Sequence, residues 1–181
     1  MGATTRKLDR TSQNDRKDAQ DFILMDSHGR AVRLQSLLES GPAVINFYRG
    51  GWCPYCNIEL LEFQQALPQI ESLGASLIAI SPDLPCDALA TEQRNRLTFP
   101  VLSDVGNTIA KRFGIVRKPT PDLRALYKES PQGREGANEF PIPSAFVIDQ
   151  TRSVRMAYIE KNFHQHIASA KAVGALRKLH G

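Results

Sequence analysis

The chain has 181 residues, of which 41% are hydrophobic and 23% charged, and this favours one globular domain with a real core over a disordered chain. No uninterrupted apolar run exceeds four residues, and the first twenty residues are polar, so neither a membrane span nor a secretory signal is expected and a cytoplasmic location is predicted. The net charge of +4 is spread thinly, which predicts a solvated surface and no nucleic-acid partner.

The N-terminal part of the chain is predicted to be an arm followed by a hairpin. Residues 1–20 carry few apolar side chains and are expected to form a flexible arm, with a single folded domain over 21–181. Phe22–Met25 and Ala31–Leu34 flank a glycine-containing turn and predict a β-hairpin. A short helix over 35–39 follows.

The rest of the chain alternates strands and helices. Short apolar segments predict strands over 43–48, 75–80, 99–102, 143–149 and 153–159. Apolar periodicity predicts helices over 54–73, 87–97, 107–113 and 167–179, with an irregular segment and one helical turn between 117 and 140. This order predicts an α/β thioredoxin-like sandwich, with a mixed central β-sheet flanked by helices.

The motif that carries chemistry lies where the first buried strand ends and the longest helix begins. Cys53 and Cys56 form a Cys-x-x-Cys pair there. Two cysteines three residues apart lie on one helical face and can close a disulfide, and the N–H groups of a helix N-terminus favour a thiolate. Pro54 suits the first helical turn, where its missing N–H costs nothing. The pattern therefore predicts redox chemistry.

A structural zinc site is the alternative use of such a pair. It would need two more ligands, which Cys86, His164 and His166 offer in principle, but no second pair has the usual spacing. No metal is therefore predicted, and no nucleotide or flavin motif is present, so no cofactor is expected. Cys86 itself is predicted to be a free, partly buried cysteine.

Five segments resemble the CxxC-bearing branch of the peroxiredoxin-like proteins, in the alkyl hydroperoxide reductase/thiol-specific antioxidant superfamily. They are Phe47–Cys56, Ala79–Pro82, Phe99–Asp104, Asp122–Tyr127 and Ile142–Asp149. The sequence Trp52-Cys53-Pro54-Tyr55-Cys56 is also similar to thioredoxin and glutaredoxin active sites. The resemblance implies a thioredoxin fold and thiol-dependent reduction of hydroperoxides, without a metal or an organic cofactor.

The two resemblances imply different roles for the dithiol. By the peroxiredoxin pattern, Cys56 attacks the peroxide, while Cys53 stands at the family's Thr/Ser, Arg49 at its proline and Pro143 at its peroxide-binding arginine. By the thioredoxin pattern, Cys53 attacks, Cys56 resolves, and Pro143 is a cis-proline opposite the dithiol. We expect Cys53 to be the more exposed thiol and to attack protein disulfides, and Cys56 to react with small peroxides. The Ile142–Pro143 peptide bond is expected to be cis.

Four further residues are expected to support the dithiol. Arg49 is either a cation that stabilises a thiolate or peroxide oxygen, or a surface cation at a strand end. Trp52 is either part of a docking surface or a cap on the core. Pro54 and Tyr55 complete the motif between the cysteines. Solvated histidines are predicted at His164, His166 and His180.

These residues together predict a thiol peroxidase whose reaction ends in a reversible Cys53–Cys56 disulfide, with Cys86 taking no part. The expected substrate is a hydroperoxide or a disulfide, and the expected reductant is of the thioredoxin or glutathione type. The alternatives are a thioredoxin-like protein disulfide reductase and a non-catalytic redox sensor or binding module of the same fold. A monomer and a homodimer both stay open.

Overall fold

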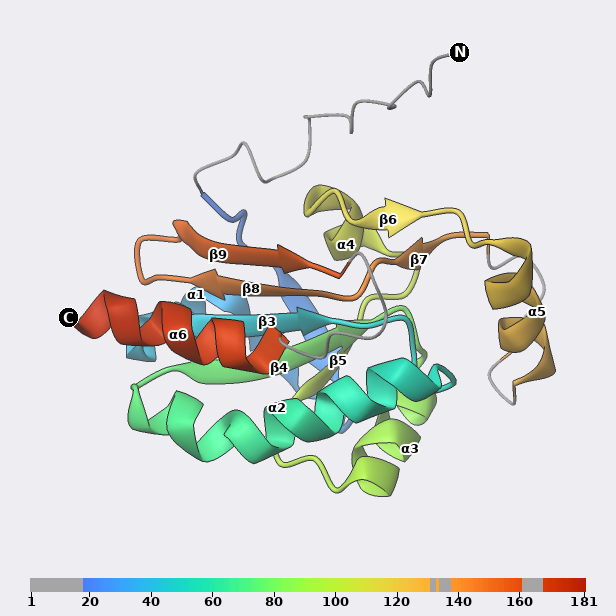
Figure 1. Ribbon diagram of the computed structural model, residues 1–181, viewed down its shortest axis with the longest axis horizontal. Helices are drawn as coiled ribbons and strands as arrows, with labels where there is room; N and C mark the ends of the chain where they lie inside the picture. Colours follow the sequence, from blue (N-terminus) through green and yellow to red (C-terminus); the bar gives the residue numbers. More distant parts are fainter. Residues whose placement is uncertain (1–17, 131–132, 134–137, 161–167) are drawn as a thin grey trace, which may run out of the picture.

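The computed structural model describes residues 18–130, 133, 138–160 and 168–181, and its centre is a mixed seven-stranded sheet (Figure 1). The strand order is β2-β1-β5-β4-β3-β8-β9. Strands β3, β4 and β5 are parallel, and the remaining pairings in this sheet are antiparallel. The strands are β1 (Ile23–Asp26), β2 (Ala31–Arg33), β3 (Ala43–Phe47), β4 (Ser76–Ser81), β5 (Val101–Ser103), β8 (Ser144–Ile148) and β9 (Val154–Ile159). The predicted mixed sheet and its hairpins are confirmed.

Helices cover both faces of the sheet (Figure 1). They are α1 (Leu34–Ser40), α2 (Pro54–Ser72), α3 (Pro85–Asn95), α4 (Thr108–Arg112), α5 (Pro121–Glu129) and α6 (Ala168–His180). The segment expected to be irregular also holds a small separate ribbon, β6 (Val116–Arg117) paired with β7 (Phe140–Pro141). Within the described residues, no helix is long and apolar enough to cross a membrane.

The central strand β3 is buried on both faces and divides the core in two. Val44 packs in a cluster with apolar residues of α2, α3 and α6. Its neighbours Ala43, Ile45 and Phe47 point the opposite way and pack with residues of α1 and α4. Because alternate side chains of a strand face opposite sides, this short apolar segment supplies both halves of the core, as expected for a buried central strand.

Two expectations about the chain's ends and turns need correction. The fold takes in residues before Phe22, because Ala19 is buried and its N–H donates to the carbonyl oxygen of Arg152 at 2.7 Å. The Ile142–Pro143 bond is trans, so the predicted cis-proline is wrong. The chain passes directly from β7 into β8 there, and backbone hydrogen bonds at Ile142 and Pro143 hold it. The carbonyl oxygen of Pro143 accepts from the Glu160 N–H at 2.9 Å. The predicted arm lies almost wholly outside the described residues.

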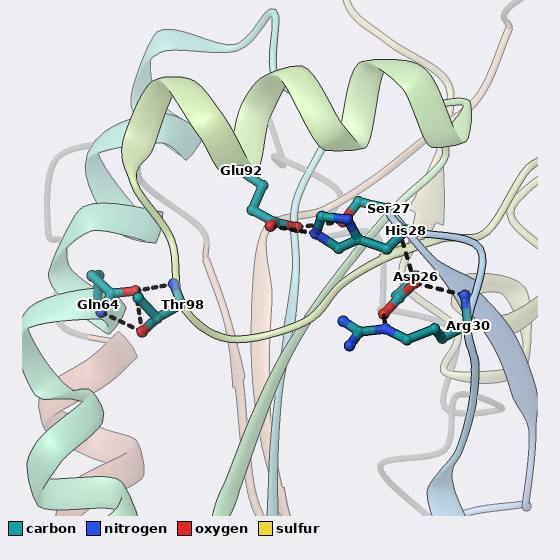
Figure 2. A network of polar contacts seen from close by, with 7 residues as sticks. All are labelled: Asp26, Ser27, His28, Arg30, Gln64, Glu92 and Thr98. Carbon is teal, nitrogen blue, oxygen red and sulfur yellow. Dashed lines mark hydrogen bonds and ion pairs between the residues drawn. The ribbon is translucent and has the colours of Figure 1, made fainter.

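Side-chain contacts join α3 to the turn of the β1–β2 hairpin (Figure 2). Glu92 of α3 accepts a hydrogen bond from the Ser27 hydroxyl and pairs with His28 Nε2 at 2.8 Å, which ties the helix to the β1–β2 turn. Gln64 of α2 and Thr98 exchange further hydrogen bonds, with Thr98 N donating to Gln64 Oε1 at 2.8 Å. These contacts are relevant to the site because α3 also packs against the loop that precedes α2.

Candidate active site

The loop between β3 and α2 is held against α3 by contacts to its backbone. Asp83 Oδ2 accepts a hydrogen bond from the Gly51 N–H at 2.8 Å, and Arg94 Nη2 donates to the Gly51 carbonyl oxygen at 2.7 Å. A Cβ at position 51 would overlap the Thr91 hydroxyl, so only glycine permits this approach. The loop thereby sets the position from which α2 starts.

The two motif cysteines lie at the start of α2 and are both buried. Cys53 is the N-cap residue with extended backbone, Pro54 is the first helical residue, and Cys56 lies in the first turn. Each cysteine is 1% exposed, so the expectation that Cys53 is the more exposed thiol is wrong. The reason is tertiary: residues of α5 and of the β6–β7 ribbon enclose the start of the helix.

The two thiols nevertheless differ in their acidity. A hydrogen bond from Cys56 lowers the pKa of Cys53 to about 6 against the opposing effect of burial, and the charge and hydrogen bond of Arg49 lower it further. Burial raises the pKa of Cys56 well above its usual value, and its hydrogen bond to Cys53 and the charge there raise it further. At neutral pH the pair is therefore a Cys53 thiolate that accepts a hydrogen bond from the Cys56 thiol.

Arg49 is buried rather than a surface cation at the strand end. It is 6% exposed, and its side chain hydrogen-bonds to the Cys53 sulfur. Its carbonyl oxygen accepts a hydrogen bond from Trp52 Nε1 at 3.2 Å, which fixes the backbone of the loop. A buried guanidinium beside a thiolate stabilises the anion strongly because water screens the pair poorly. The alternative in which Arg49 supports the thiolate therefore fits the structure.

A pocket of about 480 Å³ leads to Cys53, while Cys56 is not among its lining residues. Tyr55 is 44% exposed and also lines it. The other lining residues are mostly apolar with a few charged ones: Arg49, Arg117, Lys118, Pro119, Thr120, Asp122, Leu123, Leu126, Phe140, Pro141 and Ile142. Cys53 therefore borders a pocket whose lining is largely apolar and which also includes the Arg49 cation.

The structure also gives the positions of the remaining predicted site residues. Trp52 is 7% exposed, and its ring meets Tyr127 and Phe140 with centroids 5.2 and 5.3 Å away, so it caps the core. Pro54 is exposed at the first position of α2. Pro143 is buried but does not line the Cys53 pocket, whereas the two residues before it do.

Cys86 and His180 are not among the residues that line the pocket at Cys53. Cys86 is exposed at the start of α3, not partly buried as expected. The described residues hold no group of three His, Cys, Asp or Glu side chains that could bind a metal ion. His164 and His166 fall outside the described residues, and His180 Nδ1 lies 3.0 Å from the carbonyl oxygen of Leu176. The pairing of Cys53 with Cys56, without Cys86, stays a prediction.

One further titratable residue near the dithiol on α2, Glu59, belongs to no motif in the sequence. This carboxylic acid is 7% exposed on the inner face of α2, one turn beyond Cys56, and Asn46 Nδ2 donates to its Oε1 at 2.6 Å. Burial raises the pKa of Glu59 to about 7. The available signal was its position four residues before Phe63, which places an acid on a helix face that is otherwise apolar.

Comparison with known proteins agrees with this geometry. Residues 16–157 match the AhpC/TSA family. The chain is 31% identical over 159 residues to "Putative peroxiredoxin Rv1608c" of Mycobacterium tuberculosis, covering 88% of this chain and 93% of that protein. It is 30% identical over 108 residues to the thiol-disulfide oxidoreductase ResA of Bacillus thuringiensis, covering 59% of this chain and 61% of ResA.

Solved structures show the same fold. The crystal structure of peroxidoxin BcpB from Mycobacterium tuberculosis superposes with a TM-score of 0.73 at 28% identity, covering 90% of this chain and 95% of that one. The bacterioferritin comigratory protein of Xanthomonas campestris, at 19% identity, superposes with a TM-score of 0.71, covering 88% and 92% of the two chains. The family match, the thioredoxin fold and the buried dithiol agree, and the chain belongs to the AhpC/TSA family of peroxiredoxin-like thiol peroxidases.

Proposed function

We propose that this protein reduces small organic hydroperoxides, with Cys53 as the attacking thiolate and Cys56 as the resolving thiol. The observation that carries the proposal is the placement of the Cys53 sulfur, which lines a pocket beside the Arg49 guanidinium and accepts a hydrogen bond from Cys56. Cys56 has neither the access nor the acidity that the peroxiredoxin pattern requires of an attacking cysteine, so the role in peroxide reduction expected for it passes to Cys53.

The reaction follows from these positions. The Cys53 thiolate attacks the terminal oxygen of the hydroperoxide, a sulfur–oxygen bond forms as the oxygen–oxygen bond breaks, and the leaving alkoxide takes a proton to become an alcohol. Arg49 stabilises both the thiolate and the charge that develops on oxygen. Cys56 then displaces the oxygen from the Cys53 sulfenic acid as water and closes the disulfide, which an external dithiol reduces.

The recessed position of Cys53 favours small hydroperoxides over protein disulfides as substrates. A protein disulfide would have to reach a sulfur in a side chain that is only 1% exposed, whereas a small peroxide fits a pocket of about 480 Å³. A reductant of the thioredoxin type is the expected electron donor, and it would have to gain access to the Cys53–Cys56 disulfide from the side of Pro54 and Tyr55, the two exposed residues between them. A cytoplasmic location and a homodimer stay proposals from the sequence.

Single cysteine variants test the assignment in stopped-flow reactions with an organic hydroperoxide. Cys53→Ser should lose the reaction entirely. Cys56→Ser should keep the first step, because serine still offers a hydroxyl donor to the thiolate, and should accumulate a sulfenic acid that dimedone traps. The opposite result, with Cys56→Ser inert and Cys53→Ser reactive, would overturn the assignment in favour of the peroxiredoxin pattern.

A further inference from the structure

A second cavity adjoins the pocket at Cys53, and the reaction described so far does not use it. Its volume is about 690 Å³, within the range of roughly 300–1,000 Å³ that small-molecule sites occupy. Arg49, Lys118 and Phe140 line both spaces, so the cavity and the pocket meet at these residues. This end of the molecule is where β3 passes into α2, beside α5 and the β6–β7 ribbon (Figure 1). A ligand in the second cavity therefore lies next to the pocket at Cys53.

The charges around this second cavity favour an anion that also carries hydrogen-bond donors. Its lining holds more basic than acidic side chains, namely Arg49, Lys111, Lys118 and Arg124 against Asp83 and Glu139. Lys111 and Glu139 pair with each other at 2.9 Å. The positive excess attracts carboxylates, which guanidinium and ammonium groups bind with charge-assisted hydrogen bonds, and the two acids can accept from N–H groups. A short peptide that carries carboxylates matches this lining, which we call the basic cavity.

Arg49 links the charge of the dithiol to the basic cavity. It is 6% exposed, and its charge and hydrogen bond stabilise the Cys53 thiolate. When Cys53 enters a disulfide its sulfur becomes neutral, so Arg49 loses this anion. A buried cation that has lost an anionic neighbour binds another anion more tightly, because water screens it poorly. We therefore expect the basic cavity to bind anions more tightly when the dithiol is oxidised than when it is reduced.

An anion that prefers the oxidised protein suits the step that follows oxidation. In that step the disulfide has to be opened, and a thiolate opens a disulfide by attacking one of its sulfur atoms. The Cys53 side chain is 1% exposed and borders the neighbouring pocket, whereas Cys56 does not line it. The recess that favours small hydroperoxides as substrates thus also admits a small thiol more readily than a protein.

We propose that a peptide thiol of low molecular weight reduces the Cys53–Cys56 disulfide, with its carboxylates in the basic cavity and its sulfur in the pocket at Cys53, as a second donor beside the thioredoxin type. The proposal rests on the proposed function only in requiring that the dithiol closes. The donor thiolate attacks the Cys53 sulfur, the Cys53–Cys56 bond breaks, and Cys56 leaves and takes the proton that the donor thiol released. A second donor thiolate then attacks the sulfur of the first, which releases the Cys53 thiolate and the donor's own disulfide.

Binding is measured apart from reduction with S-methylglutathione, which keeps the carboxylates of a peptide thiol but has no free thiol. Trp52 is the single tryptophan of the chain and lines the basic cavity, so its fluorescence reports occupancy. The disulfide form, prepared with diamide, should bind this probe about tenfold more tightly than the reduced form. Because coupling is reciprocal, the probe should also move the alkylation midpoint of Cys53 in the reduced protein to higher pH. Equal affinity for the two forms, or an unmoved midpoint, would contradict the proposal.

Reduction is measured by mixing the disulfide form with glutathione, with its glycine ethyl ester or with uncharged mercaptoethanol, and following the fluorescence of Trp52. Glutathione should react about fivefold faster than the ester, which lacks one carboxylate. Arg124 lines the basic cavity but not the pocket at Cys53, so Arg124→Glu should slow the reaction with glutathione about fivefold and leave that with mercaptoethanol unchanged. Lys128→Glu makes the same change of charge on α5 at an exposed residue that lines neither space, and should alter neither rate.

The outcomes separate this proposal from the proposed function. It would be overturned by equal rates for glutathione and its ester, by equal effects of Arg124→Glu and Lys128→Glu, or by a disulfide form that thioredoxin reduces and glutathione does not. A protein whose diamide-formed disulfide behaves as expected with glutathione, but whose reduced form ignores hydroperoxides, would instead refute the proposed function and leave the donor site standing.

Discussion

At the scale of single residues, the two thiols differ in acidity because of their neighbours, since both side chains are equally buried. Cys53 receives the hydrogen bond of Cys56 and the charge of Arg49, whereas Cys56 is surrounded by apolar core and faces a negative sulfur. Since the thiolate is the reactive form, alkylation of Cys53 by iodoacetamide should rise with pH through about 6 and level off near neutrality.

Replacing Arg49 with glutamine should weaken this activation. The variant loses the cation beside the sulfur, so the pKa of Cys53 rises and the alkylation midpoint moves to higher pH. The hydroperoxide reaction at neutral pH should fall about ten- to hundredfold, the effect of losing one charge-assisted hydrogen bond of roughly 1.5–3 kcal/mol in the transition state. Arg96→Gln, at the exposed end of α3, is the control for net charge and should change neither value. An unmoved midpoint in Arg49→Gln would contradict the assigned role.

At the scale of elements, the active-site loop depends on how closely α3 approaches it. Gly51 is held by Asp83 and Arg94 from one side, and the Thr91 hydroxyl occupies the space that a side chain would need. The hydrogen-bond network of Figure 2 keeps α3 in place from its other side, through Glu92. The geometry of the dithiol is thus set by helix packing as well as by the motif itself.

Gly51→Ala should therefore push the loop away from α3. The added methyl group overlaps Thr91, and a shift weakens the hydrogen bonds to the position-51 backbone, so the free energy of unfolding should fall by about 2–3 kcal/mol and the pKa of Cys53 should rise. Urea unfolding and the alkylation profile measure the two effects. Adding Thr91→Ala removes the overlapping hydroxyl and should restore part of both. A double variant no better than Gly51→Ala would show that this contact is not the cause.

At the scale of the whole molecule, the buried Glu59 makes the free energy of unfolding depend on pH. Its pKa is raised from 4.5 to about 7 in the folded state, so between these values the folded protein holds a proton that the unfolded chain has released. The contribution of this bound proton to the free energy of unfolding is complete below pH 4.5 and is lost as pH rises through 7. The reason is that stability falls with pH wherever the native state binds more protons than the unfolded chain. The core therefore tolerates the acid best when it is neutral.

Glu59→Gln should remove this dependence. At pH 5 the variant and the parent should unfold at similar urea concentrations, whereas at pH 8 the variant should be more stable by roughly 3 kcal/mol. Both proteins are measured with the dithiol reduced, so that the opposite pH effect of Cys53 cancels in the difference. A stability difference that stays constant between pH 5 and pH 8 would refute the buried charge.

The fold was largely predictable because its signals are local. The alternation of short apolar segments with amphipathic helices predicted the hairpin, the central strand β3, the helix α2 after the CxxC motif and the closing β8–β9 pair. The small β6–β7 ribbon was missed because two-residue strands carry no periodicity. The cis-proline expectation came from a resemblance, and the trans bond between Ile142 and Pro143 does not follow it.

For the site, the sequence by itself determined the dithiol, its position at a helix start and the chemistry open to it, since these depend on residue type and spacing along α2. Only the tertiary structure decided that Cys53 is recessed, that Arg49 is buried beside it, and that Cys86 is exposed. It also brought Asn46 of β3 against Glu59 of α2. Burial and long-range contacts decide these properties, because the pKa of a thiol or carboxyl depends on the charges and solvent around it, and segments distant in the sequence supply that surrounding.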